Sequence, residues 1–185
     1  MKDRLRSEAK NRLRTMISVE RQQASLQIQQ SLKSFLQEQS GIWAGYQALS
    51  DEPSINWSDV SEKISWVFPV SGADRQLIFK SVTSGLAQSA LGVNEPLKGE
   101  AVELKDISGV VLPALGFDQR GYRLGRGGGY YDRTLAGYTG QKLGLCFEIN
   151  FFKNLPEEPH DVRCNPVFTE KNVYHTEGVL SCKSY

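Results

Sequence analysis

The residues best suited to chemistry lie in one short stretch, residues 116–133, which is rich in glycine and arginine. Its glycines and arginines are Gly116, Gly121, Gly125, Gly127, Gly128 and Gly129, with Arg120, Arg123, Arg126 and Arg133. Glycine permits positive φ angles and close approach of a ligand to the main chain, and arginine grips phosphate or carboxylate oxygens with a planar charged fork. Exposed N–H groups in such a loop form an anion site, which a helix directly after it strengthens. We expect that helix at Tyr130–Leu135.

The same stretch carries a carboxylate near either end, Asp118 and Asp132. Asp132 offers a hard oxygen ligand for the Mg²⁺ that usually accompanies a nucleotide. The alternative is a mobile surface loop or an RGG-like RNA-binding segment, but disordered Gly/Arg tracts are usually long and repetitive, whereas this one is short and flanked by apolar residues. Neither the dinucleotide G-x-G-x-x-G nor the P-loop pattern fits cleanly. The residues favour a phosphate-binding loop without identifying a reaction.

Two runs in this region, Leu112–Asp118 and Gly121–Arg133, closely resemble the signature of the 5-formyltetrahydrofolate cyclo-ligase family, also called methenyltetrahydrofolate synthetase. The resemblance implies an enzyme of the ligase class that cyclises 5-formyltetrahydrofolate to 5,10-methenyltetrahydrofolate and releases ADP and phosphate. The implied cofactors are ATP and Mg²⁺, and the implied partner is a reduced folate. In the family mechanism the formyl oxygen attacks the γ-phosphate, and N10 then closes the ring.

The resemblance also implies roles for individual residues of the loop. Arg123 and Arg126 are expected to act in catalysis by stabilising the triphosphate and its developing charge, and the amides of Gly127–Gly129 to cradle the phosphates. The full nucleotide-binding set is Lys2, Arg6, Arg123, Gly125, Arg126, Gly127, Gly128, Gly129, Tyr130, Tyr131 and Asp132. The folate-binding set is Glu52, Arg126 and Tyr130. Family members often carry a lysine where this chain has Gly128, so the arginines are expected to take a larger share of charge stabilisation.

The N-terminal segment is predicted to be a helix over Lys2–Met16, because apolar residues recur on one face. Those residues are Leu5, Ala9, Leu13 and Met16. Basic residues occupy much of the rest, and most of them are expected to form a solvated face. The family opens with a Lys-x-x-Leu-Arg element that meets the ATP phosphates. Lys2, Leu5 and Arg6 match it, so the resemblance assigns Lys2 and Arg6 to the nucleotide.

A polar loop after the predicted strand Ile42–Tyr46 is the second candidate region. Tyr46–Glu52 resembles the family's Tyr-x-Pro-x-x-x-Glu segment, whose glutamate contacts the folate. Loops that follow strands are where α/β proteins place ligands, although a lone loop glutamate is more often exposed to solvent. Ala48 replaces the usual proline, and from Pro53 the chain departs from the family pattern. We expect Glu52 to contact the substrate.

A third candidate pairs His160 with Asp161 in a proline-rich loop. The only other histidine is His175, which argues against a His-rich transition-metal site. The family has a Leu-Pro-x-Glu-x-His-Asp motif here, and its aspartate is a magnesium ligand. The resemblance therefore implies that Asp132 and Asp161 hold Mg²⁺, together with substrate phosphates.

A weaker resemblance covers Ala90–Pro96, which is similar to the family's Phe-Gly-Ile-x-Glu-Pro segment. A glycine turn followed by a Glu-Pro corner also explains these residues. Glu95 is therefore expected to have a structural role.

The remaining elements predict an α/β fold. A second helix is expected over Val19–Gln39, with Ser18 as N-cap. Further predicted elements are strands at Ile64–Val70, Leu77–Val82, Gly109–Leu112 and Lys142–Phe147, a short helix at Trp57–Lys63, and a turn or helix at Phe151–Leu155. Strand, glycine loop and helix in that order is an α/β arrangement. The resemblance implies a three-layer Rossmann-like sandwich with a mainly parallel central sheet, as a single domain over residues 1–185.

Composition limits the function classes. The net charge of +1 gives no general field for nucleic acid, and no apolar run approaches membrane-span length. Cys146, Cys164 and Cys182 show no metal or disulfide spacing, and no signal peptide is recognisable, so we expect a cytoplasmic monomer without nucleic-acid or membrane partners. Two alternatives stay open: a relative that uses another substrate, and a non-enzymatic nucleotide- or RNA-binding module.

Overall fold

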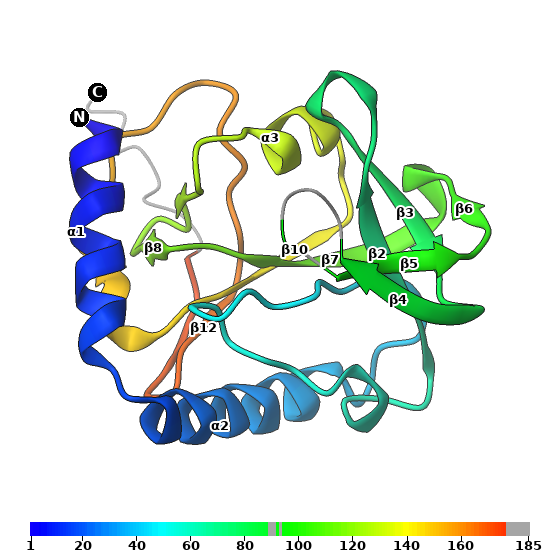
Figure 1. Cartoon of the computed structure of the whole chain (residues 1–185), viewed down its shortest axis with the longest axis horizontal. Coiled ribbons are helices and arrows are strands. Elements are labelled where there is room, and N and C mark those ends of the chain that lie inside the picture. The colour runs from blue at the N-terminus through cyan, green and yellow to red at the C-terminus, as the bar shows by residue number, and fades with distance from the viewer. Residues whose placement is uncertain (89–91, 93, 177–185) are drawn as a thin grey trace, which may run out of the picture.

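A mixed eight-stranded sheet runs through the middle of the molecule (Figure 1). The computed structural model describes residues 1–88, 92 and 94–176. The strand order is β13-β12-β10-β7-β1-β2-β3-β6. The central strands are parallel: β1 (Gly41–Ala44), β2 (Ile64–Ser71), β7 (Ile107–Pro113), β10 (Gln141–Leu145) and β12 (Val167–Phe168). Antiparallel strands β3 (Leu77–Ser81), β6 (Ala101–Val102) and β13 (Val173–Tyr174) complete the two sides. The predicted α/β class with a mainly parallel sheet is confirmed.

Helices cover both faces of this sheet. In Figure 1, α2 (Ser18–Leu36) lies along one face and the short α3 (Tyr130–Thr134) lies on the other, while α1 (Lys2–Thr15) stands across one end. The expected N-cap of α2 is wrong by one residue, because Ser18 is already helical and Ile17 is the cap. The Ile17 N–H donates to Glu20 Oε2 at 3.0 Å, so a glutamate in the first turn closes this end.

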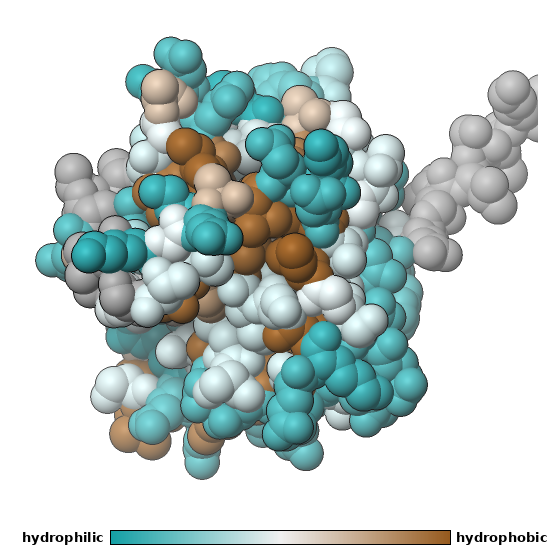
Figure 2. All heavy atoms as spheres, turned by 90° about the vertical axis from the view of Figure 1, so that its right-hand side faces the viewer, coloured by the Kyte–Doolittle hydropathy of each residue, from teal (hydrophilic) through white to brown (hydrophobic). Residues whose placement is uncertain are grey.

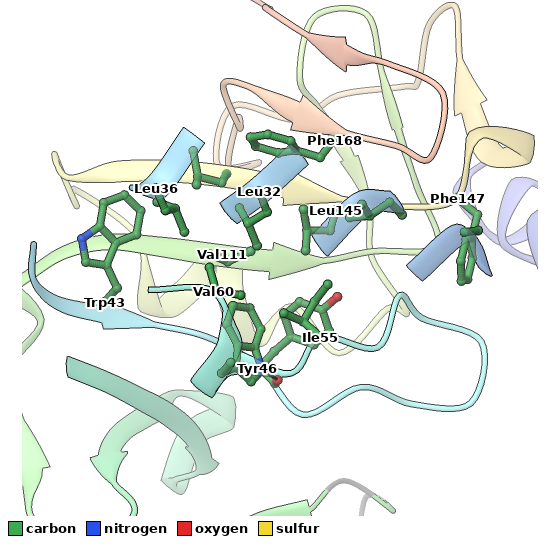
Figure 3. Close-up of a cluster of buried hydrophobic side chains, with 14 of the residues drawn as sticks. Leu32, Leu36, Trp43, Tyr46, Ile55, Val60, Val111, Leu145, Phe147 and Phe168 are labelled. Carbon is green, nitrogen blue, oxygen red and sulfur yellow. Dashed lines mark hydrogen bonds between the residues drawn. The ribbon is translucent and has the colours of Figure 1, made fainter. Parts of the chain in front are cut away.

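The larger core cluster fills the space between α2 and the sheet. Leu32 and Leu36 of α2 face Trp43, Val111 and Leu145 from the strands (Figure 3). Parallel strands with covered faces read as continuous apolar runs. The approach of Trp43 is close, because a Cβ at Gly109 would lie 2.2 Å from its ring. Glycine at position 109 therefore leaves the space that the indole occupies.

Several short elements differ from the predictions. The helix expected at Trp57–Lys63 is only one turn of 3-10 helix, Trp57–Asp59, and the turn or helix expected at Phe151–Leu155 begins as strand β11 (Phe151–Phe152). Strand β11 joins β8 (Gly116–Asp118) and β9 (Arg123–Leu124) in a small second sheet. Further 3-10 turns span Ala73–Arg75, Leu104–Asp106 and Glu148–Asn150. These segments are too short for periodicity to define them.

A hairpin of β4 (Ser84–Gln88) and β5 (Asn94–Lys98) packs against β2 and β3. Figure 2 views this end of the molecule, where apolar side chains interrupt a largely polar surface. Ile78 of β3 is 44% exposed. Residues 90, 91 and 93 of the predicted Ala90–Pro96 segment, and Cys182, lie outside the described residues. Within the described residues, no helix has the length and apolarity needed to cross a membrane.

The order of the parallel strands determines where a ligand site can form. From β1 the chain passes to β2 and β3 on one side, and it later returns to β7 and β10 on the other side. Ligands of open α/β sheets bind where the strand order reverses, outside the carboxyl ends of the strands. In this sheet that place lies beyond the ends of β1 and β7.

Candidate active site

A pocket of about 390 Å³ lies at the carboxyl ends of β1, β2 and β7. Its wall includes residues that follow β1, residues at the end of β2 and the loop between β9 and α3. The start of α1 and the segment 158–161 complete it. All the predicted site residues line this one pocket: Lys2, Arg6, Glu52, Arg123, Gly125, Arg126, Gly127, Gly128, Gly129, Tyr130, Tyr131, Asp132 and Asp161. The structure thus brings them together, and their individual roles stay predictions.

The glycine loop between β9 and α3 contains backbone conformations with positive φ, which residues with a Cβ rarely adopt. Gly127 has φ +102° and Gly129 has φ +66°, both in the range that glycine adopts at little cost. Gly129 is also the N-cap of α3. Arg6 of α1 donates from Nε to the Gly125 carbonyl at 2.9 Å, and Arg133 donates to the Gly128 carbonyl. Two arginines therefore hold the loop, one from each side in the sequence.

Lys2 links the beginning of α1 to the distant segment that carries Asp161. Its Nζ lies 2.7 Å from Asp161 Oδ2 and 3.2 Å from Glu158 Oε1. Burial acts to lower the pKa of Lys2, but the hydrogen bonds to Asp161 and Glu158 outweigh it and raise the pKa above its usual value. The ammonium therefore stays charged in the pocket wall.

A second ion pair joins Arg123 to Asp132, which was predicted to be a metal ligand. Arg123 Nη2 lies 2.7 Å from Asp132 Oδ2, and the Arg123 side chain is only 6% exposed. The guanidinium carbon also lies 5.3 Å from the centre of the Tyr131 ring, a cation–π distance. The other carboxylate oxygen of Asp132 accepts a hydrogen bond from the Val162 N–H at 3.3 Å. Asp132 is thereby connected to the Asp161 segment as well.

The third ion pair connects the glycine loop to the loop after β1. Arg126 Nε donates to Glu52 Oε1 at 2.9 Å, and its Nη2 pairs with Asp51. Glu52 is 8% exposed, unlike most lone loop glutamates, and its Oε2 accepts from the Leu49 N–H at 3.1 Å. Burial raises the pKa of Glu52, and the lowering effect of Arg126 offsets this only in part.

The wall near β1 and β2 is less polar. Tyr46, Leu49, Pro69 and Leu77 line it, together with the polar Ser71 and Glu95. The Tyr46 hydroxyl donates to the Pro53 carbonyl at 2.5 Å, so the segment that departs from the family pattern fixes this ring. Burial raises the pKa of both Tyr46 and Tyr131, which keeps their hydroxyls neutral.

Asp132 and Asp161 could hold Mg²⁺ if a substrate supplied further oxygen ligands. The described residues contain no group of three or more His, Cys, Asp or Glu side chains that could hold a metal. Asp132 and Asp161 supply hard oxygens in one pocket, and two carboxylates with substrate phosphates form an ordinary Mg²⁺ environment. The donor set therefore fits the ion. His160 also lines the pocket; its side chain is 67% exposed, and its Nε2 lies 3.5 Å from Glu158 Oε2.

Two residues that received no role from the sequence organise the approach to Asp161. Asp118 is fully buried, and its carboxylate accepts hydrogen bonds from the N–H groups of Arg120, Tyr122 and Leu155 at 2.9–3.0 Å. The Arg120 guanidinium bonds to Asp118 and Glu157 and to the Leu155 carbonyl. This cluster joins the β8–β9 turn to the segment before Asp161. The sequence signal that could have identified this role is an aspartate, Asp118, at the start of a turn, where its carboxylate can accept from nearby backbone N–H groups.

Comparisons with known proteins show which sequences this chain resembles. A family model described as "5-formyltetrahydrofolate cyclo-ligase family" matches residues 1–170. A protein of Mycolicibacterium smegmatis named 5-formyltetrahydrofolate cyclo-ligase is 38% identical over 92 residues, which is 46% of this chain and 46% of that protein. By these alignments the chain spans about half the length of the first curated relatives it matches. A mouse protein of the same name is 27% identical over 186 residues, covering 90% of this chain and 92% of that protein.

A solved structure of a protein with a related name has a similar fold. The NMR structure of Aquifex aeolicus 5,10-methenyltetrahydrofolate synthetase superposes with a TM-score of 0.82 at 29% sequence identity. The superposition covers 100% of this chain and 97% of that chain. The similarity therefore includes every layer of the sandwich.

Proposed function

The chain belongs to the 5-formyltetrahydrofolate cyclo-ligase family, and we propose that it converts 5-formyltetrahydrofolate to 5,10-methenyltetrahydrofolate in an ATP- and Mg²⁺-dependent reaction. The observation that carries this proposal is the set of three ion pairs around one glycine loop. Lys2 with Asp161, Arg123 with Asp132, and Arg126 with Glu52 supply cations for phosphates and carboxylates for a metal and a folate.

The chemistry requires activation of a poor leaving group. The formyl oxygen attacks the γ-phosphorus of ATP, the bond to the bridging oxygen of ADP breaks, and a phosphorylated iminium species forms. N10 then attacks the formyl carbon, the carbon–oxygen bond breaks, and phosphate departs while N10 loses its proton. Phosphoryl transfer of this kind depends mainly on positioning and charge neutralisation.

The residues of the pocket match those needs. In the proposal, Arg123 and Arg126 stabilise the triphosphate, Lys2 and Arg6 contact it from α1, and the amides of Gly127–Gly129 cradle it. Because Gly128 carries no side-chain charge, the arginines take the share of charge stabilisation that a lysine there would supply. Glu52 contacts the folate, and Tyr130 packs at the junction of the two substrates.

Asp132 and Asp161 would hold Mg²⁺, which when bound neutralises phosphate charge. Both carboxylates are paired with cations, Arg123 and Lys2. We expect these cations to turn to the phosphates when the metal and nucleotide enter together. The buried neutral hydroxyls of Tyr46 and Tyr131 would contribute no competing charge.

The test is an absorbance assay for 5,10-methenyltetrahydrofolate, with and without MgATP, on the wild type and Asp132→Ala. Turnover that requires MgATP and largely vanishes in Asp132→Ala is the expected result. Asp106→Ala removes an exposed aspartate outside the pocket and is the matched control. If folded wild type binds ATP but gives no product, the proposed reaction is wrong; if Asp132→Ala stays active, Asp132 leaves the metal site.

One alternative has a specific observation in its favour. Ala48 and Pro53 depart from the family pattern next to Glu52, and the Pro53 carbonyl holds the Tyr46 hydroxyl in the pocket wall. A relative acting on a different substrate would bind ATP but not 5-formyltetrahydrofolate. Calorimetric titration with each ligand separates the two functions.

A further inference from the structure

A second glutamate lines the pocket, on a different element from Glu52. Glu95 belongs to β5, whose hairpin packs against β2 and β3. It contacts Ser71, the last residue of β2, and β2 lies two strands from β7 in the central sheet. The sequence predicts only a structural role for Glu95, but a residue in the pocket wall can also contact a ligand.

The two carboxylate oxygens of Glu95 differ in their surroundings. Oε1 accepts hydrogen bonds from the Ser71 backbone N–H at 3.2 Å and from the Ser71 hydroxyl at 2.8 Å. No described residue donates a hydrogen bond to Oε2. One oxygen is thus fixed to the end of a central strand, which orients the other, and the side chain is only partly exposed.

Glu52 differs in this respect. Its Oε1 accepts from Arg126 and its Oε2 accepts from the Leu49 N–H. Both of its oxygens therefore already have protein partners. Of the two glutamates that line this wall, Glu95 is the one with an oxygen to which no described residue donates. Apolar Pro69 and Leu77 line the same wall and suit a flat ring.

We propose that Glu95 recognises the bicyclic ring of the reduced folate, with its Oε2 accepting a hydrogen bond from the ring's 2-amino group. This inference rests on the proposed function. The 2-amino group and the neighbouring N3–H are donors, and an ionised carboxylate only accepts. Hydrogen bonds to a charged group are shorter and stronger than those between neutral groups. A site built to receive a donor rejects an analogue that lacks it.

The competing explanation is that Glu95 only anchors the β4–β5 hairpin through Ser71. The variant Glu95→Gln separates the two explanations. Its amide oxygen can still accept from both Ser71 donors, so the anchor is kept. Its NH₂ group then replaces Oε2, so that a donor of the protein faces the 2-amino donor of the ring. An anchoring residue would tolerate this change, whereas a recognition residue would not.

The experiment measures binding of two ligands by calorimetry in the presence of MgADP. The ligands are 5-formyltetrahydrofolate and its 2-desamino-2-methyl analogue, and the proteins are the wild type, Glu95→Gln and Glu100→Gln. Glu100 is exposed, does not line the pocket, and serves as the matched control. We expect Glu95→Gln to weaken 5-formyltetrahydrofolate binding roughly ten- to a hundredfold and the analogue hardly at all.

Each other outcome overturns the proposal. Equal weakening of both ligands would show a structural role, and unchanged binding of both would show no role. If wild type binds and cyclises 5-formyltetrahydrofolate while Glu95→Gln behaves like wild type, the inference fails and the proposed function stands. If wild type binds no reduced folate, both fail. MgADP affinity and thermal unfolding check that the variants are folded, and Glu95→Asp, which keeps the charge but withdraws the oxygens, repeats the test.

Discussion

At the scale of single residues, three cations of the pocket are already paired with carboxylates. Lys2, Arg123 and Arg126 each contact at least one Asp or Glu in the pocket wall. Partly buried pairs of this kind are screened less by water than surface pairs. The protonation state of each carboxylate therefore decides whether its cation keeps its position.

Glu52 gives a prediction for acidic pH. Its pKa in the folded protein lies above the ordinary value of 4.5, because burial disfavours the charge. As pH falls through this raised pKa, Glu52 becomes neutral and its pair with Arg126 weakens, so we expect kcat/KM to fall on an acid limb that lies above pH 4.5. Steady-state kinetics from pH 4 to 8 measures the limb.

The same shift has a consequence for stability with a defined sign. The folded state binds the Glu52 proton more readily than the unfolded chain does. The contribution of this group to the free energy of unfolding therefore decreases as pH rises from the unfolded pKa to the raised folded pKa. Glu52→Gln should remove both effects, and Glu62→Gln, outside the pocket, should remove neither. An acid limb that persists in Glu52→Gln would assign it to another group.

At the scale of elements, the site depends on how short segments are joined. The β8–β9 turn, the segment before Asp161 and the start of α1 approach one another through Asp118, Arg120 and Lys2. These contacts connect parts of the chain that periodic patterns treat separately.

Asp118 should therefore be needed for stability and for the position of Asp161. Asp118→Ala leaves the buried N–H groups of Tyr122 and Leu155 without an acceptor and removes a partner of Arg120. Leaving these N–H groups without an acceptor costs about 3 kcal/mol in total. Urea unfolding measures the loss. Glu157→Ala at the exposed end of the same arginine is the control and should cost clearly less, because solvent screens an exposed ion pair. Equal losses would contradict the assignment.

Gly121 and Gly137 form a matched pair for the backbone. Both have positive φ, +82° and +75°, so alanine strains either one by about 1 kcal/mol. A Cβ at Gly121 would lie 2.2 Å from the Cys164 carbonyl oxygen, whereas one at Gly137 meets nothing within 4 Å. We expect Gly121→Ala to lower the melting temperature clearly more than Gly137→Ala. Similar melting temperatures would mean that the β8–β9 turn can shift away from Cys164.

The sequence predicts these elements unevenly. The periodic apolar residues of α1 and α2 and the runs in β2 and β7 define their elements, because burial imposes those patterns. Strands β8, β9 and β11 have two or three residues each, too few for a pattern. The site residues came from a family motif, but the pairs Lys2–Asp161 and Arg126–Glu52 depend on tertiary folding. The second acceptor, Glu95, is defined only by its contact with Ser71.

At the scale of the whole molecule, the second core cluster encloses two thiols. Cys146 and Cys164 are fully buried, and burial raises the pKa of both, that of Cys164 to about 12. The thiolate is the form that attacks a thiol reagent, so neither cysteine should react while the protein is folded.

This protection provides a measure of unfolding. In a Cys182→Ser background, we expect the two remaining cysteines to react only as fast as the protein opens. MgATP and 5-formyltetrahydrofolate should slow labelling further, because ligands that bind only the folded state lower the open population. Mass spectrometry after timed labelling gives the rates. Rapid native labelling of either cysteine would contradict the enclosed core.

The ion pairs of the pocket, which exist before any ligand binds, can exchange partners with the charges of an incoming metal complex. When magnesium and a polyphosphate arrive together, Asp132 and Asp161 can pass to the metal while Arg123 and Lys2 pass to phosphate oxygens, so none of these four charges loses its partner. We therefore expect the affinity for MgATP to vary only weakly with salt, measured as the slope of log Kd against log salt concentration. Inorganic phosphate or sulfate alone would draw the cations away from Asp132 and Asp161 without supplying a metal to bind these carboxylates. Such anions should compete poorly with MgATP even when they are far more abundant, which gives the pocket selectivity for its metal complex before any chemistry begins.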